Sequence, residues 1–249
     1  MSEITADAPT QGRRRRRGGD AAKPKLPFLA NQLEWGPATY LDDPTQPIDA
    51  EGVEAIHEAS MRILEEIGIL FLNDDALDVL VAAGCKVDRD TKRVHMDRGF
   101  VTEMVAKAPA QFTITPRNAE REITVGGRHF NFGQVASAPN VMDLERGRRV
   151  GNRADFQDLL RLSQSYNCIH FNCGYPVEPI DIHASIRHLD AHYDMLTLTD
   201  KVIHAYSLGP ERIEDVMEMV RIAGGMSAEE FGSRPHMFTN INSSSPLKH

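Results

Sequence analysis

Polar and aromatic side chains stand near the carboxyl ends of four segments that the sequence predicts as strands. In a parallel sheet these ends meet at one edge, where enzymes of this architecture bind their ligands. Taken alone, each Asn or Ser among them is better explained as a residue that ends a strand, so it is the set that predicts a binding site. The candidates are Gln134, Asn172, Tyr175, His204, Tyr206, Ser207, Asn240, Asn242 and Ser244.

The histidines and cysteines are weaker candidates for chemistry. His183, His188 and His192 fall on one predicted helix, but no third ligand stands at a recognisable metal-binding distance from the pair His188 and His192, so we predict no metal site. Cys168 and Cys173 have the wrong spacing for a zinc pair, and we expect them to be small core residues of a buried strand. The familiar phosphate-loop, zinc-protease and nucleophile-elbow motifs are absent from the sequence, and no catalytic residue is assigned.

The region 129–249 must position the candidates, because strands and helices alternate there. Such alternation predicts right-handed βαβ units and a parallel sheet. Four strands and three helices suit either a small open α/β sheet or the first half of a (β/α)₈ barrel, which needs eight such units. After a first strand near 129–134, the predicted strands are Ile169–Cys173, Val202–Tyr206 and His236–Ile241, and the predicted helices begin near Asn152, at Ile182 and at Pro210.

The region 51–128 has a different pattern, of helices followed by β-hairpins. Capping residues and apolar stripes predict helices over Asp49–Ile67, Asp74–Ala83 and Asp97–Ala108, and alternating apolar residues predict hairpins within 85–96 and 111–150. Residues 26–50 are rich in proline and predict an irregular arm, whose Trp35 and Tyr40 pack on their own domain or on a second subunit.

Composition and charge exclude several classes of protein. The chain has 249 residues, of which 41% are hydrophobic and 26% charged, typical of a folded domain rather than a disordered or collagen-like chain. The lack of a long apolar run or signal peptide, together with only three cysteines, predicts a cytoplasmic protein without a membrane span. The net charge is -8, although the basic residues 1–25, which we predict to be a disordered tail, carry +4; the acidic remainder argues against nucleic-acid binding.

Several segments of residues 50–249 resemble, in the same order, the N-terminal region of the trimethylamine methyltransferase (MttB-type) superfamily. They include IHEASMRILEEIGILF, LVAAGCKVD, RVHMDRGFVTEMVAKAP, HFNFGQVASAPNVMDLERGRRVGNRADFQDLLRLSQSYNCIHF, DKVIHAYS and NINSSSPLKH. The resemblance implies an α/β fold: the first half of a TIM (β/α)₈ barrel over 129–249, preceded by a helical and β-hairpin elaboration over 51–128. Members are about twice this length, so we expect an incomplete barrel in this chain.

The resemblance also implies a chemistry: methyl transfer from a methylated amine, such as trimethylamine or glycine betaine, to a corrinoid (cobalamin) on a partner protein. No cofactor would be bound directly, and a homo-oligomer is expected. A quaternary ammonium is held by aromatic faces, for which Tyr175 and Tyr206 are suited, while Asn172 and Asn242 are placed to orient a carboxylate. Two alternatives stay open: a non-catalytic, truncated barrel that acts as a binding or interaction protein, and a barrel enzyme of unrelated chemistry.

Overall fold

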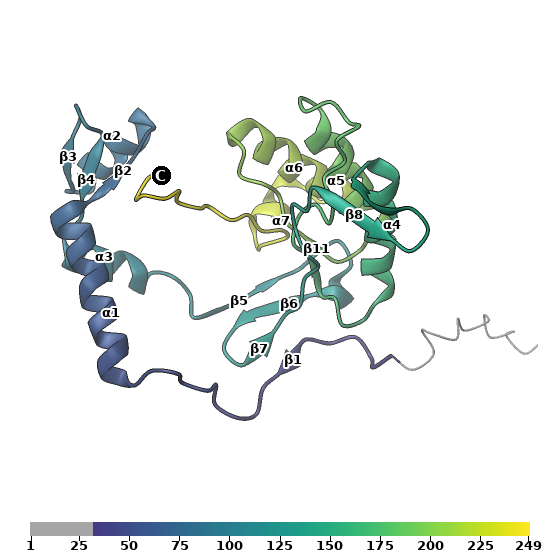
Figure 1. Ribbon diagram of the computed structural model, residues 1–249, viewed down its shortest axis with the longest axis horizontal. Coiled ribbons are helices and arrows are strands. Elements are labelled where there is room, and N and C mark those ends of the chain that lie inside the picture. Colours follow the sequence, from purple (N-terminus) through teal and green to yellow (C-terminus); the bar gives the residue numbers. More distant parts are fainter. Residues whose placement is uncertain (1–31) are drawn as a thin grey trace, which may run out of the picture. The chain divides into compact units, whose positions relative to one another are not determined.

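The computed structural model describes residues 32–249. The predicted basic tail at 1–25 therefore lies outside the described residues, as does the first part of the predicted arm. None of the described helices is long and apolar enough to cross a membrane. Figure 1 shows the order of the elements along the chain.

The first helices begin where the sequence predicts, because each has a local cap. Helix α1 (Ala50–Arg62) starts after Asp49, whose carboxylate accepts a hydrogen bond from the N–H of Gly52. It continues as a π-helical turn, η1 (Ile63–Ile67), and ends at Gly68, whose φ of 75° favours glycine. Asn73 caps helix α2 (Asp74–Ala82) and Asp97 caps helix α3 (Arg98–Ala106) in the same way.

The predicted hairpin at 85–96 is confirmed and extended by a third strand. Strands β3 (Lys86–Asp88) and β4 (Arg93–His95) pair antiparallel, and β2 (Ile69–Leu70) pairs with the other side of β4. Val94 at the centre of this sheet is fully buried, as is Leu77 of α2. This small sheet and its helices thus share an apolar centre.

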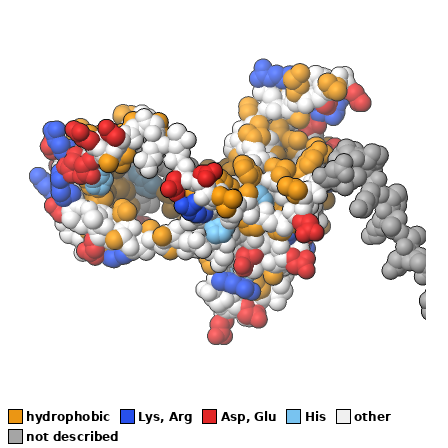
Figure 2. All heavy atoms as spheres, turned by 90° about the horizontal axis from the view of Figure 1, so that it is seen from below, with side chains coloured by type: hydrophobic (Ala, Val, Ile, Leu, Met, Phe, Trp, Pro, Cys, Tyr) orange, Lys and Arg blue, Asp and Glu red, His pale blue; other side chains and the backbone are white. Residues whose placement is uncertain are grey.

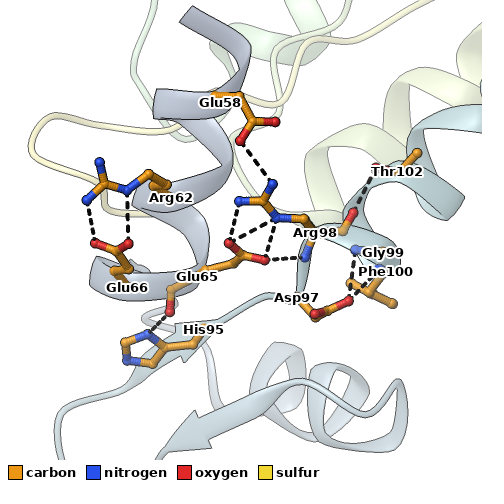
Figure 3. Close-up of polar contacts among 10 residues, drawn as sticks. All are labelled: Glu58, Arg62, Glu65, Glu66, His95, Asp97, Arg98, Gly99, Phe100 and Thr102. Atoms are coloured by element: carbon orange, nitrogen blue, oxygen red, sulfur yellow. Dashed lines mark hydrogen bonds and ion pairs between the residues drawn. The ribbon is translucent and has the colours of Figure 1, made fainter. Parts of the chain in front are cut away.

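Arg98 ties α3 to α1 and η1 (Figure 3). Its guanidinium donates hydrogen bonds to the carboxylates of Glu65 and Glu58, and its backbone N–H also donates to Glu65. These hydrogen bonds lower the pKa of the Glu65 carboxyl. His95 adds a contact, because its Nδ1 lies 2.9 Å from the carbonyl oxygen of Glu65. Arg98 therefore joins the third helix to the first.

Two of the hairpins predicted within 111–150 are confirmed. Strand β5 (Gln111–Ile114) pairs antiparallel with β6 (Ile123–Gly126), with a short 3₁₀ turn, η2 (Ala119–Arg121), between them. Strand β8 (Asn140–Asp143) pairs antiparallel with β9 (Gly147–Val150).

The arm is less irregular than predicted. Its residues Ala38–Thr39 form a strand, β1, which pairs antiparallel with β7 (His129–Phe130). The two arm aromatics pack on this chain: the Trp35 ring lies 5.1 Å from that of His170, and the Tyr40 ring 5.0 Å from that of Phe130. The backbone pairing of β1 joins residues far apart in sequence, which a composition argument does not detect.

The predicted parallel arrangement is present, but with shorter strands. Strand β10 (Phe171–Asn172) pairs parallel with β11 (Val202–Ile203), and single parallel bridges join Gly133 to Phe171 and His204 to Phe238. The four segments therefore follow one another in chain order. The prediction of strands of five or six residues is wrong. Gly174, with φ of 115°, turns the chain soon after β10, and among the described residues the fourth segment is bridged to its neighbour only at Phe238.

Three helices pack against the parallel segments. They are α4 (Arg153–Ser165), α5 (Arg187–Leu198) and α6 (Pro210–Ala223), of which α4 and α6 begin as predicted. The predicted start of α5 at Ile182 is wrong, because residues 180–186 form turns, and a short helix, α7 (Ala228–Gly232), was not predicted.

The main core lies between these helices and the parallel segments. It contains Phe156 and Leu160 of α4, Met195 of α5, and Val216 and Val220 of α6. The described residues form a mixed α/β structure without a closed barrel. Apolar side chains also remain at the surface, and Figure 2 shows many of them beside charged groups on one face.

Candidate functional site

The parallel segments present two faces with different side chains. Ile203 and Ala205 belong to the core that the helices cover. Side chains alternate along a strand, so His204 and Tyr206 lie on the opposite face. Phe238, which is bridged to His204, packs its ring against the His204 ring on that face.

Aromatic rings form a continuous row that starts on this second face and ends at Tyr175, whose ring packs against Phe156 and His192 in the helix-covered core. The Phe171 and Phe238 ring centroids are 5.4 Å apart, and those of Phe238 and His204 are 4.9 Å apart. The row continues from His204 to Tyr206 at 5.1 Å and from Tyr206 to Tyr175 at 4.8 Å. These distances are those of aromatic pairs in contact, so the rings hold one another in place. We call these five residues the aromatic row.

The hydroxyl of Tyr206 joins the loops that follow three of the parallel segments. It shares a hydrogen bond of 2.6 Å with the hydroxyl of Ser137 and accepts one of 3.0 Å from the backbone N–H of Tyr175. Gly174 makes this approach possible, because a Cβ at that position would lie 2.5 Å from the Tyr206 hydroxyl oxygen. The backbone of Ser137 has a φ of 59°, which is uncommon for a residue other than glycine. The three loops therefore meet at one phenol.

His204 is buried in the row without a polar partner. Only 4% of the residue is exposed, and neither ring nitrogen has a hydrogen-bond partner among the described residues. Burial, and secondarily the nearby His192, lowers the pKa of the His204 imidazole. The ring is therefore neutral near pH 7, and the row carries no positive charge that would repel a cation.

A pocket of about 500 Å³ opens beside the row, between the β5–β6 hairpin and two of its rings. None of the described residues that line it is an aspartate, glutamate, lysine or arginine. Its walls are mainly aromatic and aliphatic, with a few amide, hydroxyl and imidazole groups. The lining residues are Phe112, Ile114, Ile123, Val125, Gly126, His129, Phe130, Asn131, Phe171, Phe238, Thr239 and Asn240.

Most of the residues singled out from the sequence lie around this face. Tyr175, His204 and Tyr206 belong to the aromatic row, and Asn240 lines the pocket, where its carbonyl oxygen accepts a hydrogen bond from Ser207. The Gln134 amide donates to the carbonyl oxygen of Gly174 at 3.2 Å.

Asn172 lies apart from the others. Its side chain is fully buried, accepts a hydrogen bond from the Ser163 hydroxyl and donates one to the Thr199 hydroxyl. Its register partner is Ile203, so alternation places it on the helix-covered face. Asn242 is exposed. The structure therefore does not bring these two amides together, as a shared role in orienting a carboxylate would need.

The histidine and cysteine predictions need two corrections. His183 is not on the same helix as His188 and His192, because it precedes the first turn of α5. The His188 ring pairs with Asp215, and the buried His192 ring contacts the carbonyl oxygen of His188. Cys168 is exposed rather than part of the core, since it precedes strand β10, whereas Cys173 is partly buried. In the part of the chain that the structure describes, no three potential ligands gather around a metal site.

Sequence reasoning missed the two phenylalanines of the row and Ser137. In the sequence, Phe171 and Phe238 are indistinguishable from ordinary core residues of strands. The pairing of the strands shows that both lie on the same face as His204. Ser137 carries no signal in the sequence, because its contact with Tyr206 spans 69 residues.

Comparisons with known proteins agree on one family. The family described as Trimethylamine methyltransferase (MTTB) matches residues 10–249. The chain is 36% identical over 197 residues to a glycine betaine methyltransferase of Desulfitobacterium hafniense (strain Y51), a match that covers 79% of this chain and 40% of the relative.

Two more distant relatives carry related names. A trimethylamine methyltransferase MttB of Desulfitobacterium hafniense (strain DSM 10664 / DCB-2) is 26% identical over 80% of this chain and 40% of its own length. A proline betaine:corrinoid methyltransferase of Eubacterium limosum is 26% identical over 54% of this chain and 27% of its own length. The chain thus spans about 40% of the length of the first two curated relatives.

Proposed function

The chain belongs to the trimethylamine methyltransferase (MTTB) family, and we propose that the whole protein moves a methyl group from a quaternary amine of the glycine betaine type to a corrinoid on a partner protein. The relative named for glycine betaine, at 36% identity, favours a quaternary amine over trimethylamine. The relative named for a corrinoid supports the choice of acceptor.

The observation that carries the proposal is the aromatic row beside a pocket without acidic or basic walls. A quaternary ammonium has no N–H to donate, so hydrogen-bond acceptors cannot select it. Aromatic faces attract it electrostatically, and each contact contributes roughly 0.5–2 kcal/mol, more where water is excluded. The ring of His204, buried between Phe238 and Tyr206, supports the row without adding a positive charge, because burial lowers the pKa of its imidazole.

The chemistry that follows is a displacement at the methyl carbon. The reduced corrinoid supplies the electron pair of the new bond to carbon. The bond between the methyl carbon and nitrogen breaks, and its electron pair stays on nitrogen, so the amine leaves neutral. The residues of this chain would hold the cation against the row. Because the product amine lacks the charge that the rings attract, it binds more weakly than the substrate and is released.

The test is methyl transfer to reduced cobalamin by the whole protein, with glycine betaine, proline betaine, carnitine and trimethylamine as substrates. We expect the highest kcat/KM with one of the quaternary amines. Tyr206→Ala should reduce binding of that amine by roughly 0.5–2 kcal/mol, whereas Tyr206→Phe keeps the ring and most of the binding.

Two outcomes would count against parts of the proposal. Absence of transfer from every amine in the panel would reject the reaction. Equal binding by the wild type and Tyr206→Ala would remove Tyr206 from the site and leave the reaction standing. Tyr193→Ala is a matched control, since this tyrosine of α5 is 59% exposed and lines neither the pocket beside the aromatic row nor the cleft at Tyr175 and Tyr206.

A further inference from the structure

A second, polar cleft borders the aromatic row at Tyr175 and Tyr206. It has a volume of about 270 Å³ and lies among the loops after the parallel segments and the first turns of α5 and α6. Unlike the pocket beside Phe171, it is lined by charged groups. Among the residues that line it are Tyr175, Glu178, Arg187, Tyr206, Leu208 and Arg212.

The two arginines of the cleft differ in how far they are already paired. Arg187 donates through Nε and Nη2 to the carbonyl oxygen of Ile182, at 3.2 and 3.0 Å, and its Nη1 lies 3.7 Å from the carboxylate of Glu178. Arg212 has no hydrogen bond or ion pair with any residue that the structure describes. Its guanidinium, a planar group with five donors, is therefore available to a ligand.

Tyr175 offers a second unused donor. The residue is only 5% exposed, and its hydroxyl, which lies at the cleft, has no hydrogen-bond partner among the described residues. Burial, and then the charge of Glu178, raises the pKa of this phenol, so it stays protonated and able to donate. The cleft thus presents two donors that are bonded to no described residue, although the carboxylate of Glu178 also lines it.

The start of α6 adds a partial positive charge at the same place. Leu208, which precedes this 14-residue helix, and Arg212, which lies in its first turn, both line the cleft. The N-cap is Gly209, which has no side chain to accept from the first N–H groups. The uncapped amino end of a helix favours a negative group nearby.

We propose that this cleft binds a carboxylate, which pairs with the guanidinium of Arg212 and accepts a hydrogen bond from the hydroxyl of Tyr175. A monoanion is favoured over a phosphate dianion, because Glu178 also lines the cleft and only one arginine is unpaired. Tyr206 lines the cleft and belongs to the aromatic row, so a small zwitterion can reach both. This inference rests on the proposed function and adds the residue that selects a betaine over a carboxylate-free amine.

The test is calorimetric titration of the full chain with glycine betaine, acetate and choline as probes. Glycine betaine carries both groups, acetate only the carboxylate and choline only the quaternary ammonium. We expect Arg212→Gln to weaken binding of glycine betaine and acetate by about 10- to 100-fold, the range for hydrogen bonds to a charged group, and to leave choline unchanged. Tyr175→Phe, which removes one hydroxyl, should weaken the same two probes by about 3- to 10-fold.

Arg161→Gln is the matched control, since Arg161 is an exposed arginine of α4 outside the cleft. Circular dichroism melts establish that each variant folds, and Arg212→Lys provides a milder change that keeps the charge. Unchanged binding of glycine betaine by Arg212→Gln, equal losses for glycine betaine and choline, or no binding of acetate by the wild type would each overturn the inference. Methyl transfer to reduced cobalamin is measured separately, so loss of the carboxylate site and loss of the proposed reaction give different results.

Discussion

Removing the hydroxyl of Tyr206 tests how the three loops are held together. In Tyr206→Phe the backbone N–H of Tyr175 loses its acceptor, and Tyr175 is a buried residue. A buried donor without a partner costs about 1–3 kcal/mol. The hydroxyl of exposed Ser137 also loses its partner but can turn to water, so it adds little. We expect the free energy of unfolding to fall by about 1–3 kcal/mol.

Urea unfolding of the two proteins, followed by circular dichroism, measures this loss. Ser137→Ala is the control, because it leaves Tyr206 in place to accept from Tyr175 and should cost only about 0.5–1 kcal/mol. If Tyr206→Phe stays within about 0.5 kcal/mol of the wild type, the normal scatter of a surface substitution, the phenol does not join the loops. A loss in Ser137→Ala as large as that in Tyr206→Phe would instead assign the effect to the serine.

Two further predictions concern the same face. Gly174→Ala should destabilise the fold by about 2–5 kcal/mol in the same assay, because φ is 115° and the new Cβ would lie 2.5 Å from the Tyr206 hydroxyl oxygen. Gly209→Ala, at φ of 107° but with no atom within 4 Å, should show only the backbone part of that loss, and equal losses would refute the steric argument. Burial lowers the pKa of the His170, His192 and His204 imidazoles below the ordinary 6.5. As the pH falls, these histidines therefore take up protons in the unfolded chain before they do so in the folded one. The free energy of unfolding should fall as the pH drops below about 6.5. The free energy of unfolding, measured between pH 7.5 and 5, should show a shallower fall in His204→Leu, and an unchanged slope would contradict this.

The sequence predicts the elements whose signals are local. Asp49, Asn73, Asp97 and Asn152 each cap the helix that follows through their own side chains, and Pro210 occupies the first turn of α6. Such contacts span two or three residues, so the pattern that predicts them is complete within a short window. The start of α5 has no side-chain cap, and its beginning was predicted too early.

The sequence does not show how neighbouring strands are aligned with each other. This register decides which residues of different strands lie on the same face of the sheet. The spacing of two residues places His204 and Tyr206 on the same side of the segment that continues strand β11. Asn172 lies on the other side because it pairs with Ile203. If the register were shifted by one residue, Asn172 would lie on the same side as His204. The sequence therefore predicts that His204 and Tyr206 lie on one side, but not that Phe171 and Phe238 join them in the aromatic row.

The cleft shows a second limit of sequence reasoning. Arg187 and Arg212 cannot be distinguished in the sequence, because both are arginines in the first turn of a helix. What distinguishes them is that one guanidinium is occupied by Ile182 and Glu178 and the other is not. Availability is a property of the surroundings, so it can be found only from the structure.

The proposed function and the proposed carboxylate site together predict a selectivity among methylated amines. On these proposals the aromatic row would attract any quaternary ammonium, so its contribution would be similar for choline and glycine betaine and would cancel when the two affinities are compared. A pair between a guanidinium and a carboxylate is made by glycine betaine alone. The preference for glycine betaine over choline should therefore fall toward one in Arg212→Gln, while Tyr206→Ala should weaken both ligands together. The opposite result would be a preference for glycine betaine over choline that falls in Tyr206→Ala and stays unchanged in Arg212→Gln. It would show that the aromatic row, and not the cleft, distinguishes the two ligands.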